Sequence, residues 1–570
     1  MPTQFRDAQG NTLHGDKSQA MNRSCAVEDP EHARKLLAQE LGDLIGTRGD
    51  LPGGAGKGNR NPAINADEKS DASVVPKKPP NKGQPAEVVE GRGAAKGNAD
   101  EAPAYRTPSR KRASRGIEGI REAARRDKRV RFTALLHHIT PELLTQSYQA
   151  LRRDAAVGVD GVTWEQYGEG LAQRVLELHR KVHTGAYRAQ PSRRVHIPKA
   201  DGKLRALGIA ALEDKVVQQA VVTVLEAIYE EDFMGFSYGY RRGRGQHDAL
   251  DAVWMGIDRH KVEWIVDADI AAFFDTLDHG WMMKFLEHRV ADRRVLRLIA
   301  KWLKAGVLED GRRVASEKGT PQGAVISPLL ANVYLHYVFD LWAHQWRRRN
   351  AGGAVIMVRY ADDSVLGFEH ENEAKMFLAA MHERLAKFGL ALHAQKTRLI
   401  EFGRHAAERR QQRGQGNPET FDFLGFTHCC GSTRSGRFSV RRLTAKKRMR
   451  ATLAGFKDKL KRKRHEPLRD VGVWLGRTLQ AYFNYHAVPG NLRRLNGMRW
   501  QLGRIWFRSL RRRSQRAWLN WQRFRRLANT YLPACRLIHP YPSQRFGVNH
   551  PRQEPYAVIP HVRIRAGGGG

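Results

Sequence analysis

The chain has 570 residues, and its 98 Lys and Arg against 59 Asp and Glu give a formal net charge of +39. The length predicts several domains, and so large a charge implies a polyanionic partner. No apolar run approaches the roughly 18 uncharged residues of a membrane span, and the N-terminus lacks an apolar signal core. These features exclude a membrane protein and argue against secretion, so we expect a bacterial cytoplasmic, nucleoid-associated protein.

The four cysteines do not indicate a structural or metal framework. Cys25, Cys429, Cys430 and Cys535 are too scattered for a set of disulfides and lack the paired spacing of a zinc module. We expect reduced thiols.

Residues 1–114 are predicted to form an N-terminal extension that is mostly disordered. Gly, Pro, Lys, Ala and Asn dominate residues 51–115, which contain almost no aromatic residues and cannot bury a core. A short helix is predicted over residues 30–44, where Leu36, Leu37 and Leu41 share a face.

A globular pattern begins at residue 116. Helical spacing predicts helices within residues 121–155, over FTALLHHI (132–139) and then ELLTQSYQAL (142–151), and another helix over residues 163–183. A hairpin is predicted around Asp201-Gly202. Mixed strands and helices follow, which indicates an α+β arrangement whose sheet carries acidic residues.

Two strand-like segments carry those acids. In WIVDADIAAFFD (264–275), alternation places Asp267 and Asp269 on one face. In VIMVRYADDSVLGF (355–368), Asp362 and Asp363 are adjacent at the turn of a predicted hairpin. Adjacent carboxylates repel each other, and this repulsion raises the pKa of both. A bound divalent cation offsets the repulsion. A solvated surface turn is the alternative, but the apolar flanks favour a core hairpin.

Carboxylates from two strands suit phosphoryl or nucleotidyl transfer. That chemistry uses two metal ions about 3.5–4 Å apart. Mg²⁺ takes one or two protein carboxylates plus water and substrate phosphates, so three acids are enough.

The segment 437–528 is strongly basic. It has 27 Lys and Arg against three acids, Asp458, Glu466 and Asp470, which contributes +24 of the total charge. Apolar residues recur at helical spacing, which predicts a helical bundle. A solvated face normally mixes charge signs, whereas one sign beside aromatic residues favours nucleic-acid contact.

Seven blocks, in this order, resemble the group II intron-encoded reverse transcriptases over roughly residues 115–430. The blocks are VHIPKADGKLRALGI (195–209), FSYGYRRGRGQHDAL (236–250), DIAAFF (269–274), GTPQGAVISPLLANVYL (319–335), YADD (360–363), LHAQKTRL (392–399) and FDFLGF (421–426). Any one block is weak evidence, but seven in order make coincidence very unlikely.

The resemblance implies a right-hand polymerase fold. The expected domains are a finger extension (115–194), fingers and palm (195–436), an α-helical thumb or maturase X domain (437–515) and a basic DNA-binding segment without an endonuclease domain (516–570). The implied activity is RNA-directed DNA polymerisation from dNTPs with Mg²⁺. The implied partners are a group II intron RNA, whose splicing and retrohoming the protein promotes, and a target DNA. A second copy of the chain, in a homodimer, is a further candidate partner.

The resemblance also assigns individual roles. The family pattern selects Asp269 rather than Asp267 as the third metal ligand beside Asp362 and Asp363, and Asp275 and Asp278 are expected to cap a helix. The expected dNTP contacts are Lys199, Arg205, Phe274, Gln322 and Lys396. The expected primer grip is Leu424 and Gly425, and the expected nucleic-acid contacts are Arg511, Arg512 and Arg513.

Several of these roles have alternatives. Phe274 is expected to lie under the incoming sugar and exclude a 2′-hydroxyl, but Phe273 and Phe274 are also compatible with a place in the core. FDFLGF also fits an ordinary buried strand. The sequence departs from the family's usual SYGFRPG at Tyr240 and Arg242, and Arg242 adds a charge to an expected template loop.

Two other functions compete with the intron-encoded polymerase. One is a splicing-only maturase, which would need neither YADD, PQG nor the finger cations. The other is a domesticated reverse transcriptase in defence or CRISPR adaptation, although the GTPQGAVISP block is of the intron type and no nuclease-like or integrase-like segment is fused.

Overall fold

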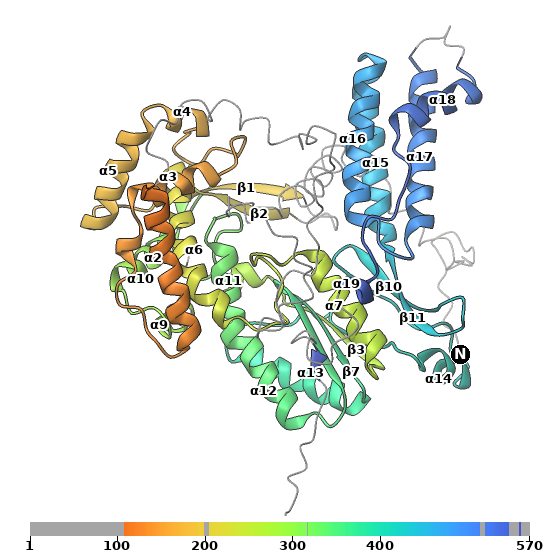
Figure 1. The fold of residues 1–570 in the computed structure, drawn as a ribbon, viewed down its shortest axis with the longest axis horizontal. Coiled ribbons are helices and arrows are strands. Elements are labelled where there is room, and N and C mark those ends of the chain that lie inside the picture. The colour runs from red at the N-terminus through yellow and green to blue at the C-terminus, as the bar shows by residue number, and fades with distance from the viewer. Residues whose placement is uncertain are drawn as a thin grey trace, which may run out of the picture.

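The computed structural model describes residues 108–198, 204–309, 311–315, 317–513, 519–545 and 558–559. The helix predicted over residues 30–44, as well as Lys199, therefore lies outside the described residues. Figure 1 shows N-terminal helices on one side, a central sheet below them, and a helical bundle on the other side. Among the described residues, no helix is long and apolar enough to cross a membrane.

The N-terminal helices differ from the prediction in three places. Helix α2, Pro108–Arg126, begins inside the segment predicted to be disordered. The helix expected near residues 132–139 is only the 3-10 turn Leu136–His138. The single helix expected over residues 163–183 is divided, because Gly170 adopts a left-handed conformation with φ +68°. The resulting helices are α3 Pro141–Ala150, α4 Trp164–Gly168 and α5 Leu171–Thr184.

A four-stranded sheet carries the predicted finger hairpin. Its strand order is β2-β1-β4-β5. The antiparallel register of β1 and β2 ends with Pro198 opposite Leu204, which confirms the hairpin, while its turn lies outside the described residues. The strands are β1 Ser192–Pro198, β2 Leu204–Ile209, β4 Val307–Glu309 and β5 Arg312–Val314.

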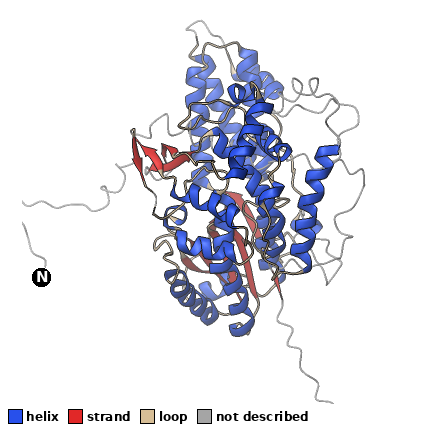
Figure 2. Ribbon diagram, turned by 90° about the vertical axis from the view of Figure 1, so that its left-hand side faces the viewer, coloured by secondary structure: helices blue, strands red, loops and turns tan. Residues whose placement is uncertain are grey.

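The central sheet, which we call the palm sheet, has the order β12-β6-β7-β3-β8. Helix α7 packs against β6, and α13 packs against β3 and β7, so that helices surround these strands in the lower half of Figure 2. The strands are β3 Trp264–Asp269, β6 Val355–Tyr360, β7 Asp363–Phe368, β8 Arg398–Glu401 and β12 Val558–Ile559. The described helices between residues 212 and 412 are α6 Leu212–Asp232, α7 Gln246–Arg259, α8 Phe273–Thr276, α9 His279–Glu287, α10 Arg293–Lys304, α11 Ser327–Leu335, the π-helix η2 His336–Asp340, α12 Leu341–Asn350, α13 Glu371–Ala386 and α14 Ala406–Gln412.

The basic C-terminal region is helical, as the apolar spacing predicts. Its bundle has its own hydrophobic core, around the fully buried Trp506. Phe524 of α18 lies in that core, so the bundle continues past the boundary expected at residue 515. The helices of this C-terminal bundle are α15 Lys446–Arg462, α16 Leu468–His486, α17 Leu492–Arg511 and α18 Trp521–Tyr531.

A β-hairpin joins the palm to the bundle. Strands β10, Phe426–Ser432, and β11, Phe438–Thr444, pair on either side of the domain boundary expected at residues 436–437. Strand β9, Phe421–Phe423, completes this sheet. The boundary therefore lies within a hairpin, and the helices start only at Lys446.

The segment after α18 returns to the palm. The backbone N–H of His539 donates to the carbonyl of Ala487, 3.1 Å away. Helix α19, Pro542–Arg545, then packs on α7. There Asp251, which is fully buried, forms ion pairs of 2.5 Å with both Arg545 and Arg442 of β11. Part of the segment expected to bind DNA thus has a structural place in the fold.

Candidate active site

The predicted acidic hairpin is present. Strands β6 and β7 pair with Tyr360 opposite Asp363, which leaves Ala361 and Asp362 as a two-residue turn. Ala361 has φ +57°, a left-handed conformation that is uncommon for a residue with a side chain. Tight turning at this point places both carboxylates at the end of the palm sheet.

The third predicted carboxylate lies beside them. In the antiparallel pairing of β3 with β7, Asp269 is directly opposite Asp363. Like charges at opposed positions are destabilising. The strand register therefore brings together the acids that the sequence places 94 residues apart.

The pKa values show the cost of this arrangement. Burial, followed by repulsion from Asp362 and Asp269, raises the pKa of Asp363 to about 7. Burial and Asp269 also raise the pKa of Asp362, while Arg205 and Lys396 lower it. The three carboxylates therefore form an acidic site that favours additional positive charge.

Lys396 supplies one such charge. The N–H of His393 donates to the carbonyl of Asp269, 2.8 Å away, so the 392–399 segment runs along the end of β3. This places the Lys396 ammonium 2.5 Å from Oδ2 of Asp269. The predicted phosphate contact therefore lies at the acidic site.

The donor set fits a hard divalent cation. All three side chains offer carboxylate oxygens, the ligands that Mg²⁺ prefers. Among the described residues, no three His, Cys, Asp or Glu side chains converge closely enough to hold an ion by themselves. Asp269, Asp362 and Asp363 could therefore hold an ion only together with ligands from outside the chain, and water and substrate phosphate are the further ligands that Mg²⁺ usually takes.

Asp267, the rival ligand, has a different partner. It lies opposite Arg398 of β8, whose guanidinium is 3.4 Å from its Oδ2. Burial raises the pKa of Asp267 to about 6, although Arg398 opposes the shift. The other two acids of this region divide as well: Asp278 caps α9 by accepting from the N–H of Trp281, whereas Asp275 lies within α8 and caps nothing.

The two phenylalanines after β3 are not equivalent. Phe273 is 2% exposed and belongs to the main core, whereas Phe274 is only partly buried at its edge. The carbonyl of Phe274 accepts from the N–H of Thr320, 2.8 Å away. Phe274 therefore packs at the edge of the core with part of its surface exposed, and its place under the incoming sugar stays a prediction.

Replacing Phe274 with Ala is expected to raise ribonucleotide incorporation relative to deoxynucleotide incorporation, because space opens for a 2′-hydroxyl. The measurement is the ratio of kcat/KM for a dNTP and the matching NTP on one RNA template. Phe274→Tyr keeps the ring and serves as the control that retains discrimination. An unchanged ratio in the Ala variant would remove Phe274 from the sugar site.

The 319–323 loop packs closely against the finger strand. The N–H of Gly208 in β2 donates to the carbonyl of Gln322, 2.7 Å away. Gly323 has φ +107°, and a Cβ there would lie 3.1 Å from the Gly208 carbonyl. The loop therefore bonds to β2 through Gln322 and to Phe274 through Thr320. In this way it connects Phe274 to the strand that carries the exposed Arg205.

The expected primer grip is a hairpin turn. Leu424 and Gly425 have φ values of +47° and +79° and separate β9 from β10, so FDFLGF is not one continuous strand. The hydroxyl of Tyr485 donates to the Leu424 carbonyl, 2.7 Å away. A side chain at Gly425 would collide with the guanidinium of Arg448. The bundle therefore fixes the turn through α15 and α16.

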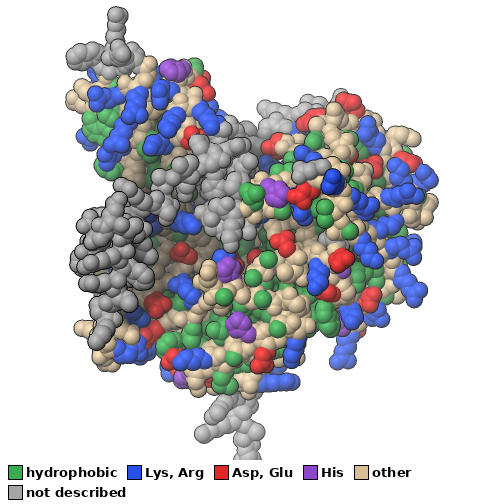
Figure 3. Space-filling model, turned by 180° about the vertical axis from the view of Figure 1, so that it is seen from behind, with side chains coloured by type: hydrophobic (Ala, Val, Ile, Leu, Met, Phe, Trp, Pro, Cys, Tyr) green, Lys and Arg blue, Asp and Glu red, His purple; other side chains and the backbone are tan. Residues whose placement is uncertain are grey.

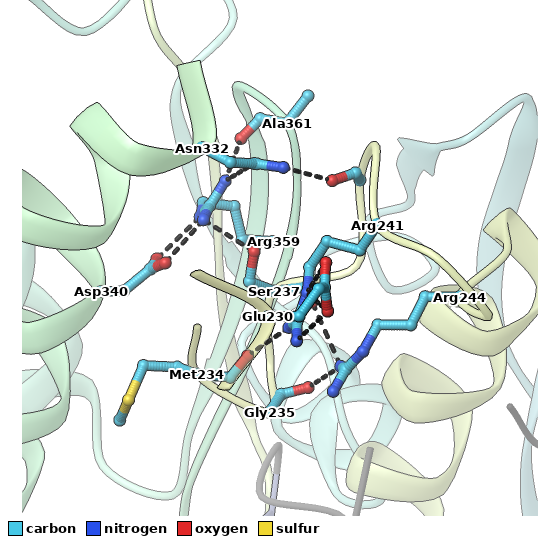
Figure 4. Close-up of polar contacts among 11 residues, drawn as sticks. Glu230, Met234, Gly235, Ser237, Arg241, Arg244, Asn332, Asp340, Arg359 and Ala361 are labelled. Atoms are coloured by element: carbon cyan, nitrogen blue, oxygen red, sulfur yellow. Dashed lines mark hydrogen bonds and ion pairs between the residues drawn. The ribbon is translucent and has the colours of Figure 1, made fainter. Parts of the chain in front are cut away.

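Sequence reasoning missed the residue that supports the acidic turn. Arg359 is 1% exposed, and its guanidinium uses all five donors (Figure 4). It donates to both carboxylate oxygens of Asp340, to Asn332, to Ser237 and to the carbonyl of Ala361, at 2.6–3.1 Å. The signal in the sequence was a charged residue within the otherwise apolar VIMVRY.

The loop that departs from the family pattern packs against the same turn. A Cβ at Gly239 would collide with the Ala361 backbone, so only glycine fits this approach. Tyr240, half exposed, has φ +57°. The extra charge of Arg242 is balanced by Glu226 of α6, whose Oε2 is 2.7 Å from Nε. Arg242 therefore adds less free charge to this loop than the sequence indicated.

Comparison with known proteins agrees with this geometry. The family described as reverse transcriptase (RNA-dependent DNA polymerase) matches residues 197–428. Protein YkfC of Escherichia coli K12 is 35% identical over 273 residues, which cover 42% of this chain and 71% of YkfC.

Two further relatives carry intron-related names. Group II intron-encoded protein LtrA of Lactococcus lactis is 34% identical over 207 residues, covering 36% of this chain and 34% of LtrA. Nuclear intron maturase 4, mitochondrial, of Arabidopsis thaliana is 25% identical over 225 residues, covering 38% of this chain and 26% of that protein. With its opposed carboxylates and the ordered motifs around them, the chain belongs to the group II intron reverse transcriptases and maturases, a family of RNA-directed DNA polymerases.

Proposed function

We propose that this chain copies a group II intron RNA into DNA with Mg²⁺ and dNTPs, and that it also binds that RNA to promote its splicing. The observation that carries the polymerase assignment is the opposition of Asp269 and Asp363 beside Asp362, with Arg205 and Lys396 close enough to shift the pKa of Asp362. A protein that only binds RNA has no use for such a costly group of charges.

Each part of the site has a place in this reaction. Bound divalent cations would lower the pKa of the attacking 3′-hydroxyl and offset charge on the leaving pyrophosphate. Asp269, Asp362 and Asp363 hold those cations. Arg205 and Lys396 bind the triphosphate, Phe274 lies beneath the sugar, and Gln322 borders the nucleotide. The Leu424–Gly425 turn holds the primer strand.

The basic bundle supports the maturase part of the proposal. Lys and Arg side chains cover much of its surface, at the upper left of Figure 3. Phosphate neutralisation by such residues gives strong, salt-dependent binding that carries little sequence information. We assign the bundle to both the thumb and the intron-binding surface, and retrohoming by target-primed reverse transcription would add a target DNA as second partner.

Replacing Arg511, Arg512 and Arg513 with Gln is expected to weaken binding of the parent intron and to flatten its salt dependence, because fewer counterions are released. Protein-assisted splicing at low Mg²⁺ is expected to fall with it. The measurement is Kd against salt concentration, together with the splicing rate.

A matched control replaces Arg293, Arg294 and Arg297, which are exposed on α10. This variant carries the same change of charge outside the bundle and is expected to splice normally. A bundle variant that loses polymerase activity but splices like the unmodified protein would restrict the bundle to the role of a thumb.

A further inference from the structure

A groove about 630 Å³ in volume lies between α17 and α18, on the surface of the C-terminal bundle. Trp500, Arg504, Phe507, Arg508 and Arg511 line it from α17, at intervals of three or four residues that form one face of a helix. Trp521 lines it from α18. Its volume is within the range of roughly 300–1,000 Å³ that is typical of ligand sites.

The tryptophans of this groove are unusually exposed for the bundle. Trp500 is 55% exposed and Trp521 is 41% exposed, whereas Trp506 on the same helix is fully buried. Trp521 meets Phe507 edge to face, with ring centroids 5.0 Å apart, and the Arg504 guanidinium lies 4.6 Å from the centre of the Trp500 ring. The groove therefore offers aromatic surface held beside positive charge.

Among the described residues that line the groove, there is no Asp or Glu to balance the positive charge. Helices α17 and α18 contain no Asp or Glu. Within the described part of the chain, the guanidinium groups of Arg504, Arg508, Arg511 and Arg512 form no ion pair with a carboxylate. Four unbalanced guanidinium groups beside exposed tryptophans are complementary to a phosphate chain whose bases are free to stack.

The position of the groove separates it from the polymerase site. In Figure 1, α17 and α18 stand on the side of the bundle farther from the finger strands β1 and β2. A primer–template duplex held between fingers and palm would leave this side of the bundle accessible. Base-paired nucleic acid presents few free base faces, whereas the loops and bulges of a folded RNA expose theirs.

We propose that this aromatic–arginine groove binds an unpaired stretch of RNA, with bases stacked on Trp500 and Trp521 and phosphates bound by Arg504, Arg508, Arg511 and Arg512. The inference rests on the proposed maturase function, because the folded intron RNA is the source of that unpaired segment. It adds a defined site and a defined RNA conformation to a general basic surface.

The test uses the full-length protein with a primer–template duplex already bound and stalled by a chain terminator, so that the polymerase site is filled. The probes are a labelled oligouridylate, an RNA duplex and an oligodeoxyuridylate of the same length. The double variant Trp500→Ala/Trp521→Ala is expected to bind the oligouridylate about tenfold or more weakly. Its salt slope is expected to stay unchanged, because stacking releases no counterions.

Three controls isolate the groove. Trp281→Ala removes a tryptophan that is 37% exposed on α9 and is expected to leave binding unchanged. Trp500→Phe/Trp521→Phe keeps aromatic rings and is expected to restore much of the affinity, which distinguishes lost stacking from misfolding. Duplex binding and primer extension are expected to stay near those of the unmodified protein.

Other results would overturn the proposal. Unchanged oligouridylate binding by the double variant removes the stacking site, and equal losses for duplex and single strand reduce the groove to a general basic surface. Equal or tighter binding of the oligodeoxyuridylate assigns the groove to a DNA strand. A Trp variant that loses oligouridylate binding but splices normally would show that the groove takes no part in the maturase function. Primer extension tests the proposed polymerase activity separately, so a failure of that proposal is distinguished from a failure of the groove.

Discussion

Replacing Asp362 with Asn is expected to lower DNA synthesis on an RNA template by roughly 10²–10³-fold or more, because charge stabilisation is the main contribution to catalysis at such a site. The substitution keeps the shape of the turn and removes one negative charge from the three acids. Steady-state primer extension measures the loss. Binding of the parent intron and protein-assisted splicing are expected to persist, because the chemistry of splicing belongs to the RNA.

Asp267→Asn is the matched control for this experiment. It is the same substitution on the same face of β3 as Asp269, but at a carboxylate that pairs with Arg398. Most of the activity is expected to remain. Near-normal extension by the Asp362 variant, or a deeper loss in the Asp267 variant, would show that the wrong carboxylates have been assigned to the metal.

Replacing Arg359 with Met is expected to destabilise the protein by about 3–5 kcal/mol, because it leaves the charge of Asp340 buried without a partner. Asp340 is 0% exposed, and the carbonyl of Ala361 also loses its donor. The acidic turn would thereby lose the hydrogen bond that Arg359 donates to its backbone. Denaturant unfolding measures the change in the free energy of unfolding, and primer extension reports on the turn.

A double variant tests whether the buried charge is the cause. Adding Asp340→Leu to Arg359→Met removes both charges and is expected to recover part of the lost stability, which a double-mutant cycle quantifies. Arg180→Met, which breaks an exposed pair with Glu177, serves as the control with little effect. A loss in the Arg359 variant as small as that of the control would contradict the supporting role.

The core of the site could be predicted because short-range patterns determine it. Alternation along residues 264–269 places Asp267 and Asp269 on one face, and the apolar flanks of residues 355–368 place the Asp362–Asp363 pair at a turn. The resemblance to the family then selects Asp269. The hairpin turn at Leu424–Gly425 was harder to predict from the sequence, because both residues adopt positive φ values that FDFLGF alone does not require. The division of α4 from α5 at Gly170 was missed for the same reason.

The support of the site could not be predicted, because it depends on contacts between distant segments. Arg359 bonds to Asp340 and Asn332 within a few tens of residues, but also to Ser237, which is 122 residues away. The thumb boundary implied by the resemblance, at residue 515, likewise missed the packing of Phe524 into a shared core, although the basic segment recognised from composition extends to residue 528. Pairings of this kind become visible only in three dimensions.

The carboxylate of Asp251 has a mechanical consequence. It joins α7 in the palm to β11 at the base of the bundle and to α19 in the returning segment, through Arg442 and Arg545. Swinging the bundle away from the palm would have to separate one buried anion from two cations at once, which is costly in an interior that water does not reach. These ion pairs therefore hold the base of the bundle rigidly to the palm, and we expect a growing duplex to move along the bundle without the bundle swinging open.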